Sequence, residues 1–171
     1  MLEFTLVFLP LICMFLVFLD IAWGIFAKST LNYAVRAGLR YGITITGTQA
    51  AACACPGASN LADMTKAKVQ RSAVGLLAGP SGLALIKVHF YAPPAPGTNA
   101  APALVDSAVD ANKPLNIMQV SVEGFNFLPL VPRILGWKDR SAPDKASTPI
   151  AATSYDMIES SRDTPPKGTV P

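Results

Sequence analysis

Metal-binding and catalytic side chains are scarce in this sequence. Its 171 residues include three cysteines and one histidine, and no two cysteines form a Cys-x-x-Cys zinc half-site or a haem-attachment motif. There is also no phosphate-binding glycine loop, no nucleophile elbow and no pair of acids at one site. The sequence therefore predicts no catalytic residue, no metal site and no cofactor, and an enzyme is the least favoured class of function.

Charge is sparse as well. Asp, Glu, Lys and Arg make up 15% of the residues, and the net charge is +3. The basic residues form no run with interleaved aromatics, so we expect no nucleic-acid partner. The single histidine, His89, has no Ser, Cys or acid close to it in sequence, which indicates an ordinary surface residue.

Apolar residues, in contrast, dominate the start of the chain. Between Glu3 and Asp20, which are the two charged residues of the segment 1–27, only Thr5 is polar. The segment is long enough to cross a bilayer as a helix, which takes about 20 residues. No small-residue cleavage site is clear after it. We therefore interpret residues 1–27 as a retained transmembrane helix rather than a signal peptide.

Two residues are unexpected in a passive anchor. Glu3 brings a carboxylate that costs about 2.5–3.5 kcal/mol at the bilayer midplane and less near the interface. It either reaches the lipid headgroups or acts within the membrane. Pro10 has no N–H for the carbonyl of Leu6, so we expect a kink or local loosening of the helix there.

The first helix is expected to continue to about Ile45, because no turn signal follows the apolar run. Ala34, Gly38 and Gly42 recur at every fourth residue and form a face of small residues that permits close helix packing. This face could pack closely against another helix or lie against the chain's own domain, and the two alternatives are compatible.

Basic residues lie on one side of the anchor only. Lys28, Arg36 and Arg40 follow it and none precedes it, so the positive-inside rule alone would place the C-terminal side in the cytoplasm. A basic leader upstream of Met1 would reverse that orientation. Cys53 and Cys55 would most simply form a small, strained disulfide loop outside the cytoplasm, and two free thiols are the alternative.

The remainder of the chain predicts one further helix and a small sheet. Asn60–Leu77 has a helical apolar pattern with Ser59 or Asn60 as its cap, and the sequence Gly-Pro-Ser-Gly from Gly79 is expected to end it. Leu85–Tyr91 and Ile117–Glu123 alternate apolar and polar residues, with Ser121 on the polar side. Pro149–Ile158 alternates more weakly. This pattern favours an antiparallel sheet of about three strands with one buried face.

The connections are long and rich in proline. Ala92–Pro114 is either functional or loosely ordered. Phe125–Trp137 is apolar but interrupted by Pro129 and Pro132, so it cannot be a regular strand throughout. We expect it to pack on the sheet or to insert against a neighbour or a membrane surface.

The sequence thus predicts an α+β chain in three parts. Residues 1–27 form the transmembrane and assembly helix. Residues 28–159 form an α+β domain, within which residues 28–46 continue the N-terminal helix and a second helix packs on the sheet. Residues 160–171 form a flexible tail.

Three stretches resemble the TadE-like proteins, which are pseudopilins of the tight-adherence branch of the type IV pilus systems. They are Leu-Glu-Phe-Thr-Leu-Val-Phe-Leu-Pro-Leu at Leu2–Leu11, the segment Ser29–Gly42, and Val-Ser-Val-Glu-Gly-Phe-Asn-Phe-Leu-Pro-Leu-Val-Pro at Val120–Pro132. The resemblance covers most of the chain, and its specificity lies in the first 42 residues. It implies a pilin-like fold for the domain.

The resemblance also implies a life cycle. A short basic leader would be cleaved by a prepilin peptidase a few residues before Glu3, and it would lie upstream of the printed sequence. The subunit would wait in inner-membrane lipid with its domain outside the cytoplasm. An assembly platform would then transfer it into a pilus at the cell surface, where it would contact other pilin or pseudopilin subunits through the N-terminal helices. Glu3 would meet a cation there, such as the N-terminal amine of an adjacent subunit.

The function favoured by these observations is that of a structural pilus subunit, whether pilin or pseudopilin. The alternative is a single-pass, membrane-anchored binding or scaffold protein that never polymerises. The alternative predicts that Glu3 is dispensable and that the protein stays with the membrane when pili are sheared off.

Overall fold

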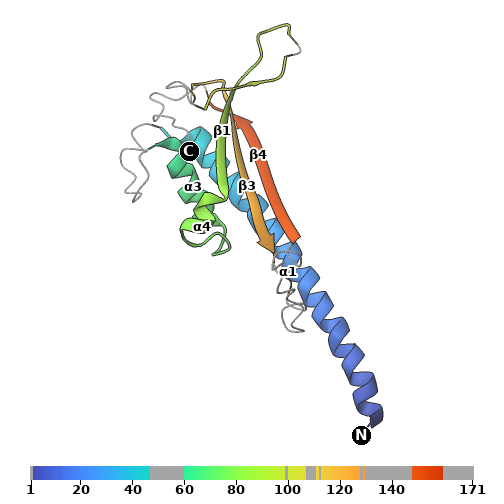
Figure 1. Cartoon of the computed structure of the whole chain (residues 1–171). Helices are drawn as coiled ribbons and strands as arrows, with labels where there is room; N and C mark the ends of the chain where they lie inside the picture. The colour runs from blue at the N-terminus through green and yellow to red at the C-terminus, as the bar shows by residue number, and fades with distance from the viewer. Residues whose placement is uncertain are drawn as a thin grey trace, which may run out of the picture. The chain divides into compact units, whose positions relative to one another are not determined.

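The computed structural model describes residues 2–46, 60–98, 100–106, 111, 113–127, 129 and 148–159. Its elements follow one another in the order α1 (Leu2–Thr44), α3 (Leu61–Ser72), α4 (Gly79–Ala84), β1 (Ile86–Ala92), β2 (Ala103–Leu104), β3 (Ile117–Phe127) and β4 (Thr148–Met157). All of them except β2 are labelled in Figure 1. The predicted α+β class with a long apolar N-terminal helix is confirmed. The tail predicted over residues 160–171 lies outside the described residues.

Contacts between residues divide the chain into two compact units. One contains Met1–Ser29 and Gly124–Ile150, and the other contains Thr30–Glu123 and Ala151–Pro171. The helix α1 and the strands β3 and β4 contribute residues to both units. The domain boundaries that the sequence suggests, after residues 27 and 159, stay predictions.

The first helix runs without interruption as predicted. α1 has 43 residues, which corresponds to about 65 Å at 1.5 Å per residue. The N–H of Ile45 still donates to the carbonyl of Tyr41 at 3.0 Å, so helical hydrogen bonding ends where the sequence places it. The helix continues through Pro10. The kink expected at that residue stays a prediction.

The second helix is shorter than predicted. Asn60 caps α3, because its side-chain oxygen accepts the N–H of Asp63 at 2.8 Å. The helix ends at Ser72 and not at Leu77, since the following turn holds Gly75 at a φ of 83°, a left-handed conformation that favours glycine. The side-chain amide of Gln70 donates to the carbonyls of Leu77 and Gly79 and so fixes this turn.

A short helix stands where the sequence predicts only a terminating turn. α4 begins at Gly79, and Pro80 occupies its first turn, where the missing N–H is not needed. A Cβ at Gly82 would lie 2.3 Å from the backbone of Leu77, so this close approach requires glycine. The glycines and proline of this segment, which predict a turn from the sequence, are therefore also compatible with a short helix.

Among the described residues the sheet has four strands, where the sequence predicts about three. Their order is β2-β1-β3-β4, and β1 pairs antiparallel with both β2 and β3. The extra strand, β2, lies within the proline-rich connection, where Tyr91 pairs with Leu104. The central register opposes Ile86 to Val122 and Phe90 to Met118. These apolar residues therefore share one face of the sheet.

The core lies on this face. Buried residues of β1 and β3 are covered by α3 and by the part of α1 that follows Ser29, and Figure 1 shows both helices on the same side of these strands. The largest fully buried side chains include Leu31 of α1, Leu61 of α3 and Phe90 of β1. Burial of a side chain of this size contributes about 1.5–3 kcal/mol.

Two predictions for β3 are corrected. Ser121, which the alternation assigns to the polar face, is fully buried, and its hydroxyl donates to Glu123 Oε1 at 3.1 Å. The strand also extends to Phe127, so the start of the apolar segment predicted as a loop is a strand. Phe127 is 8% exposed, and its ring lies 3.8 Å from the position of a Cβ on Gly24 of α1.

Candidate assembly surface

The N-terminal part of α1 exposes apolar side chains over most of its surface, apart from a half-buried stripe at Leu16, Asp20 and Gly24. Within the compact unit that holds it, these side chains remain exposed, from Leu6 at 75% to Ile12 at 39%. They are Phe4, Leu6, Val7, Phe8, Leu9, Leu11, Ile12, Met14, Phe15, Val17, Phe18, Leu19, Ile21, Trp23, Ile25 and Phe26. A helix that is apolar all round requires an apolar environment, either lipid or other helices.

The helix also satisfies the length criterion for a membrane span. Among the described residues α1 alone is long and apolar enough to cross a membrane, over Leu6–Thr44, and its most apolar window is not buried inside the structure. α1 is therefore a candidate single-pass membrane anchor, as the sequence predicts. Rings along it stack in pairs, with centroids 5.1 Å apart for Phe4 and Phe8 and 5.5 Å apart for Trp23 and Phe26.

The two residues predicted to act in assembly both lie in this helix. Glu3 belongs to its first turn, and Pro10 lies about two turns further along and is exposed. Cys13 is a free, exposed cysteine on the same helix. Cys53 and Cys55, the candidate disulfide, lie outside the described residues.

The predicted small-residue face packs inside the chain's own domain. Ala34, Gly38 and Gly42 are buried. A Cβ added to Gly38 would lie 2.2 Å from Val69 Cγ2 of α3, and one added to Gly42 would lie 2.7 Å from Met118 Cε of β3. Because these two glycines have no side chain, the side chains of α3 and β3 can pack directly against the backbone of α1.

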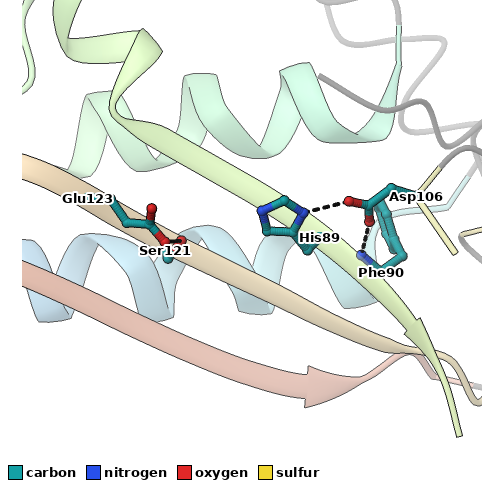
Figure 2. A network of polar contacts seen from close by, with 5 residues as sticks. All are labelled: His89, Phe90, Asp106, Ser121 and Glu123. Carbon is teal, nitrogen blue, oxygen red and sulfur yellow. Dashed lines mark hydrogen bonds and ion pairs between the residues drawn. The ribbon is translucent and has the colours of Figure 1, made fainter. Parts of the chain in front are cut away.

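A polar pair that the sequence does not reveal lies at the edge of the sheet. His89 of β1 contacts Asp106, with 2.5 Å between Nδ1 and Oδ2, and the other carboxylate oxygen accepts the N–H of Phe90 at 2.5 Å (Figure 2). Asp106 is buried at 8% exposure, whereas the side chain of His89 is 31% exposed. His89 therefore has an acidic neighbour in space, although it has none close to it in sequence.

This pair has a structural role in fixing the proline-rich connection. Asp106 follows β2, and the N–H of Val105 donates to the carbonyl of Phe90 at 2.9 Å. These interactions hold the end of the proline-rich connection against β1. Only the seventeen-residue separation between His89 and Asp106 hides the pair in sequence.

The electrostatics of the described domain show one clear perturbation. The pKa of Lys66 on α3 is lowered from its ordinary value, chiefly by burial and further by the charge of Lys87, while Asp63 opposes the shift. Within the described ranges, no group of three or more His, Cys, Asp or Glu side chains gathers in a way that could hold a metal ion.

Comparison with known proteins identifies the N-terminal segment. Residues 1–40 match the family model described as TadE-like protein. No curated protein and no solved structure matches the chain. The match confirms the resemblance to the TadE-like proteins over the segment that carries its most specific motifs.

Proposed function

We propose, on the premise that residues 1–40 match the TadE-like family, that this protein is a structural subunit of a tight-adherence-type pilus and assembles through its N-terminal helix. The observation that carries the proposal is the apolar surface of α1, whose large apolar side chains are exposed from Phe4 to Phe26 except along the half-buried stripe of Leu16, Asp20 and Gly24. The proposed role is not enzymatic.

In this proposal the helix exchanges one apolar environment for another. Lipid tails are as apolar as the side chains of a neighbouring helix. Transfer of the helix from the bilayer to a filament therefore changes its hydrophobic free energy little. Close packing and polar pairing then decide assembly. Pro10 helps because its missing N–H leaves the carbonyl of Leu6 without a helical donor, so the helix bends there at low cost.

Glu3 supplies the polar pairing. A carboxylate among apolar helices is stable only next to a cation, and the N-terminal amine of an adjacent subunit is such a partner. This requirement fixes the axial register of neighbouring subunits. The domain then lies outside the cytoplasm, first above the inner membrane and later on the pilus, after processing by a prepilin peptidase and transfer by an assembly platform.

The proposal is tested by the intact mass and the N-terminal sequence of the protein from sheared surface filaments and from membranes. A processed form in the sheared fraction supports a filament subunit. The processed form confined to the membrane would favour a minor or priming subunit. An unprocessed form found only in the membrane overturns the proposal in favour of a non-polymerising anchored protein.

A further inference from the structure

A groove of about 600 Å³ lies between the C-terminal part of α1 and β4, within the unit formed by Thr30–Glu123 and Ala151–Pro171. It combines two cations, an acid, a hydroxyl and two aromatic rings. The lining residues are Tyr33, Arg36, Ala37, Leu39, Arg40, Ser154, Tyr155 and Asp156. Its chemistry differs from that of the apolar anchor, so the filament role leaves it unused.

The cations of the groove are Arg36 and Arg40. They lie four residues apart on α1 and both are exposed, so their side chains project from neighbouring positions on the helix surface. Within the described part of the chain neither guanidinium has an ion-pair or hydrogen-bond partner. Two like charges at this spacing repel each other, and an anion bound between them would remove that repulsion.

The acid of the groove does not act as their counterion. The Oδ1 atom of Asp156 accepts the N–H of Met157 at 2.8 Å, and no ion pair joins Asp156 to another described residue. Asp156 and Ser154 therefore offer a hydrogen-bond acceptor and a hydroxyl beside the two arginines. A ligand that suits this groove has hydroxyl groups as well as a negative charge.

The aromatic rings extend the surface across the sheet. Tyr33 is 67% exposed and Tyr155 is 75% exposed. Tyr155 also lines a second hollow of about 240 Å³, together with Tyr91, Pro102, Ile117 and Gln119. The charged groove and this apolar hollow therefore adjoin at Tyr155, and an extended ligand could occupy both.

We infer that this surface binds an acidic saccharide chain. The flat, exposed rings of Tyr33 and Tyr155 and the half-buried ring of Tyr91 suit the apolar faces of sugar rings. The arginines suit their carboxylates, which they can bind with two hydrogen bonds each. Ser154, Asp156 and Gln119 suit the hydroxyl groups between the charges. A densely charged polyanion such as nucleic acid would meet the carboxylate of Asp156 and fits less well.

The test measures binding of an oligomer of galacturonic acid to the full chain in detergent micelles by calorimetry. The matched probe is the same oligomer with its carboxylates methyl-esterified, which keeps the sugar rings and removes the charge. The acid form should bind at least about tenfold more tightly than the ester, and its affinity should fall with added salt. The measurement does not depend on filament assembly, so its outcome is separable from that of the proposed function.

Variants locate the site. Arg36→Gln, Arg40→Gln and Tyr155→Ala should each weaken binding of the acid form by about tenfold, and Arg36→Lys should recover only part of the loss because lysine cannot bind a carboxylate bidentately. Arg71→Gln is the matched control, since Arg71 is an exposed arginine on α3 away from the groove. Circular dichroism establishes that each variant is folded.

Several results would overturn the inference. They are equal binding of acid and ester, an Arg71→Gln loss as large as that of Arg36→Gln, and unchanged affinity in Tyr155→Ala. Protection of Arg36 and Arg40 from an arginine-modifying reagent in the protein alone, increasing with protein concentration, would also overturn it. That result would assign the groove to contact between copies of the chain.

Discussion

Gly38 of α1 faces Val69 of α3 so closely that a Cβ added to the glycine would lie 2.2 Å from Val69 Cγ2. Val69 is fully buried in a helix, where a valine has one strongly preferred side-chain rotamer. The side chain therefore has no room to move aside. The distance between these two helices is set by the absence of a side chain on one and a branched side chain on the other.

Gly38→Ala should consequently destabilise the domain. Overpacking of this kind lowers the free energy of unfolding by about 1–3 kcal/mol, although alanine is the better helix former. Chemical denaturation of the full chain in detergent, followed by circular dichroism, measures the loss. Val69→Ala in the same chain makes room for the new methyl group, so the double variant should be more stable than the sum of the two single effects predicts.

Gly24→Ala is the matched control for Gly38→Ala. It is the same substitution on the same helix, but its Cβ would meet the Phe127 ring at an ordinary contact distance of 3.8 Å. We expect no loss of stability there. Equal destabilisation by the two substitutions would contradict the close-packing account of Gly38.

Asp106→Ala should loosen the proline-rich connection. The substitution leaves the N–H of Phe90 without its acceptor and removes the partner of His89. Loss of a partner from a buried donor costs about 1–3 kcal/mol. Hydrogen exchange of the amides of Phe90 and Val105 should become faster.

His89→Ala provides the comparison. The side chain of His89 is partly exposed, and its removal leaves the bond between Phe90 and Asp106 in place. Its effect on exchange should therefore be smaller than that of Asp106→Ala. The reverse order would show that the histidine, and not the carboxylate, holds the connection.

Lys66→Met should raise the thermal stability of the domain at neutral pH. The pKa of Lys66 is lowered in the folded protein, mainly by burial, so the unfolded chain binds the proton more tightly than the folded one. The charged lysine thus opposes folding below its folded pKa, and this penalty disappears as the pH rises through 10.5, the ordinary lysine value.

The advantage of Lys66→Met over the parent chain should accordingly shrink as the pH is raised towards 11. Melting temperatures of both proteins across this range provide the measurement. Arg71→Met is a control that removes an exposed charge from the same helix without a titration in this range. A difference between Lys66→Met and the parent that stays constant with pH would contradict the assignment to the lysine charge.

Glu3→Ala should abolish pilus assembly while leaving membrane insertion intact. The substitution removes a charge from the apolar helix, which favours insertion, but it also removes the proposed partner for the amine of the adjacent subunit. Immunoblots of sheared and membrane fractions separate the two effects. Glu3→Asp keeps the charge and should retain partial assembly, whereas normal assembly by Glu3→Ala would contradict the proposed role.

The elements that the sequence predicts well are those whose pattern is long or strictly repeated. α1 follows from its unbroken apolar run, and β1 and β3 follow from the alternation that includes Ile86, Val88 and Phe90. β2 escapes prediction because Ala103 and Leu104 are too few to show a period. α4 escapes because its opening Gly-Pro pair is equally typical of a turn.

The candidate sites differ in the same way: a site formed by neighbouring residues is visible in the sequence, and a site formed by distant residues is not. The apolar anchor is visible in sequence because its signal is local. The contact of His89 with Asp106 and the meeting of Arg40 with Tyr155 in one groove are not visible, because the fold brings together residues far apart in the chain. The burial of Ser121 likewise depends on what covers the strand and not on its alternation.

The uninterrupted course of α1 has a mechanical consequence. The helix runs from the apolar anchor to Thr44, and its second part carries Leu31, Gly38 and Gly42 into the domain core. A force along the second part of α1 would therefore act directly on the contacts of Gly38 with Val69 of α3 and of Gly42 with Met118 of β3. This part of the helix can leave the domain only if these packed side chains separate.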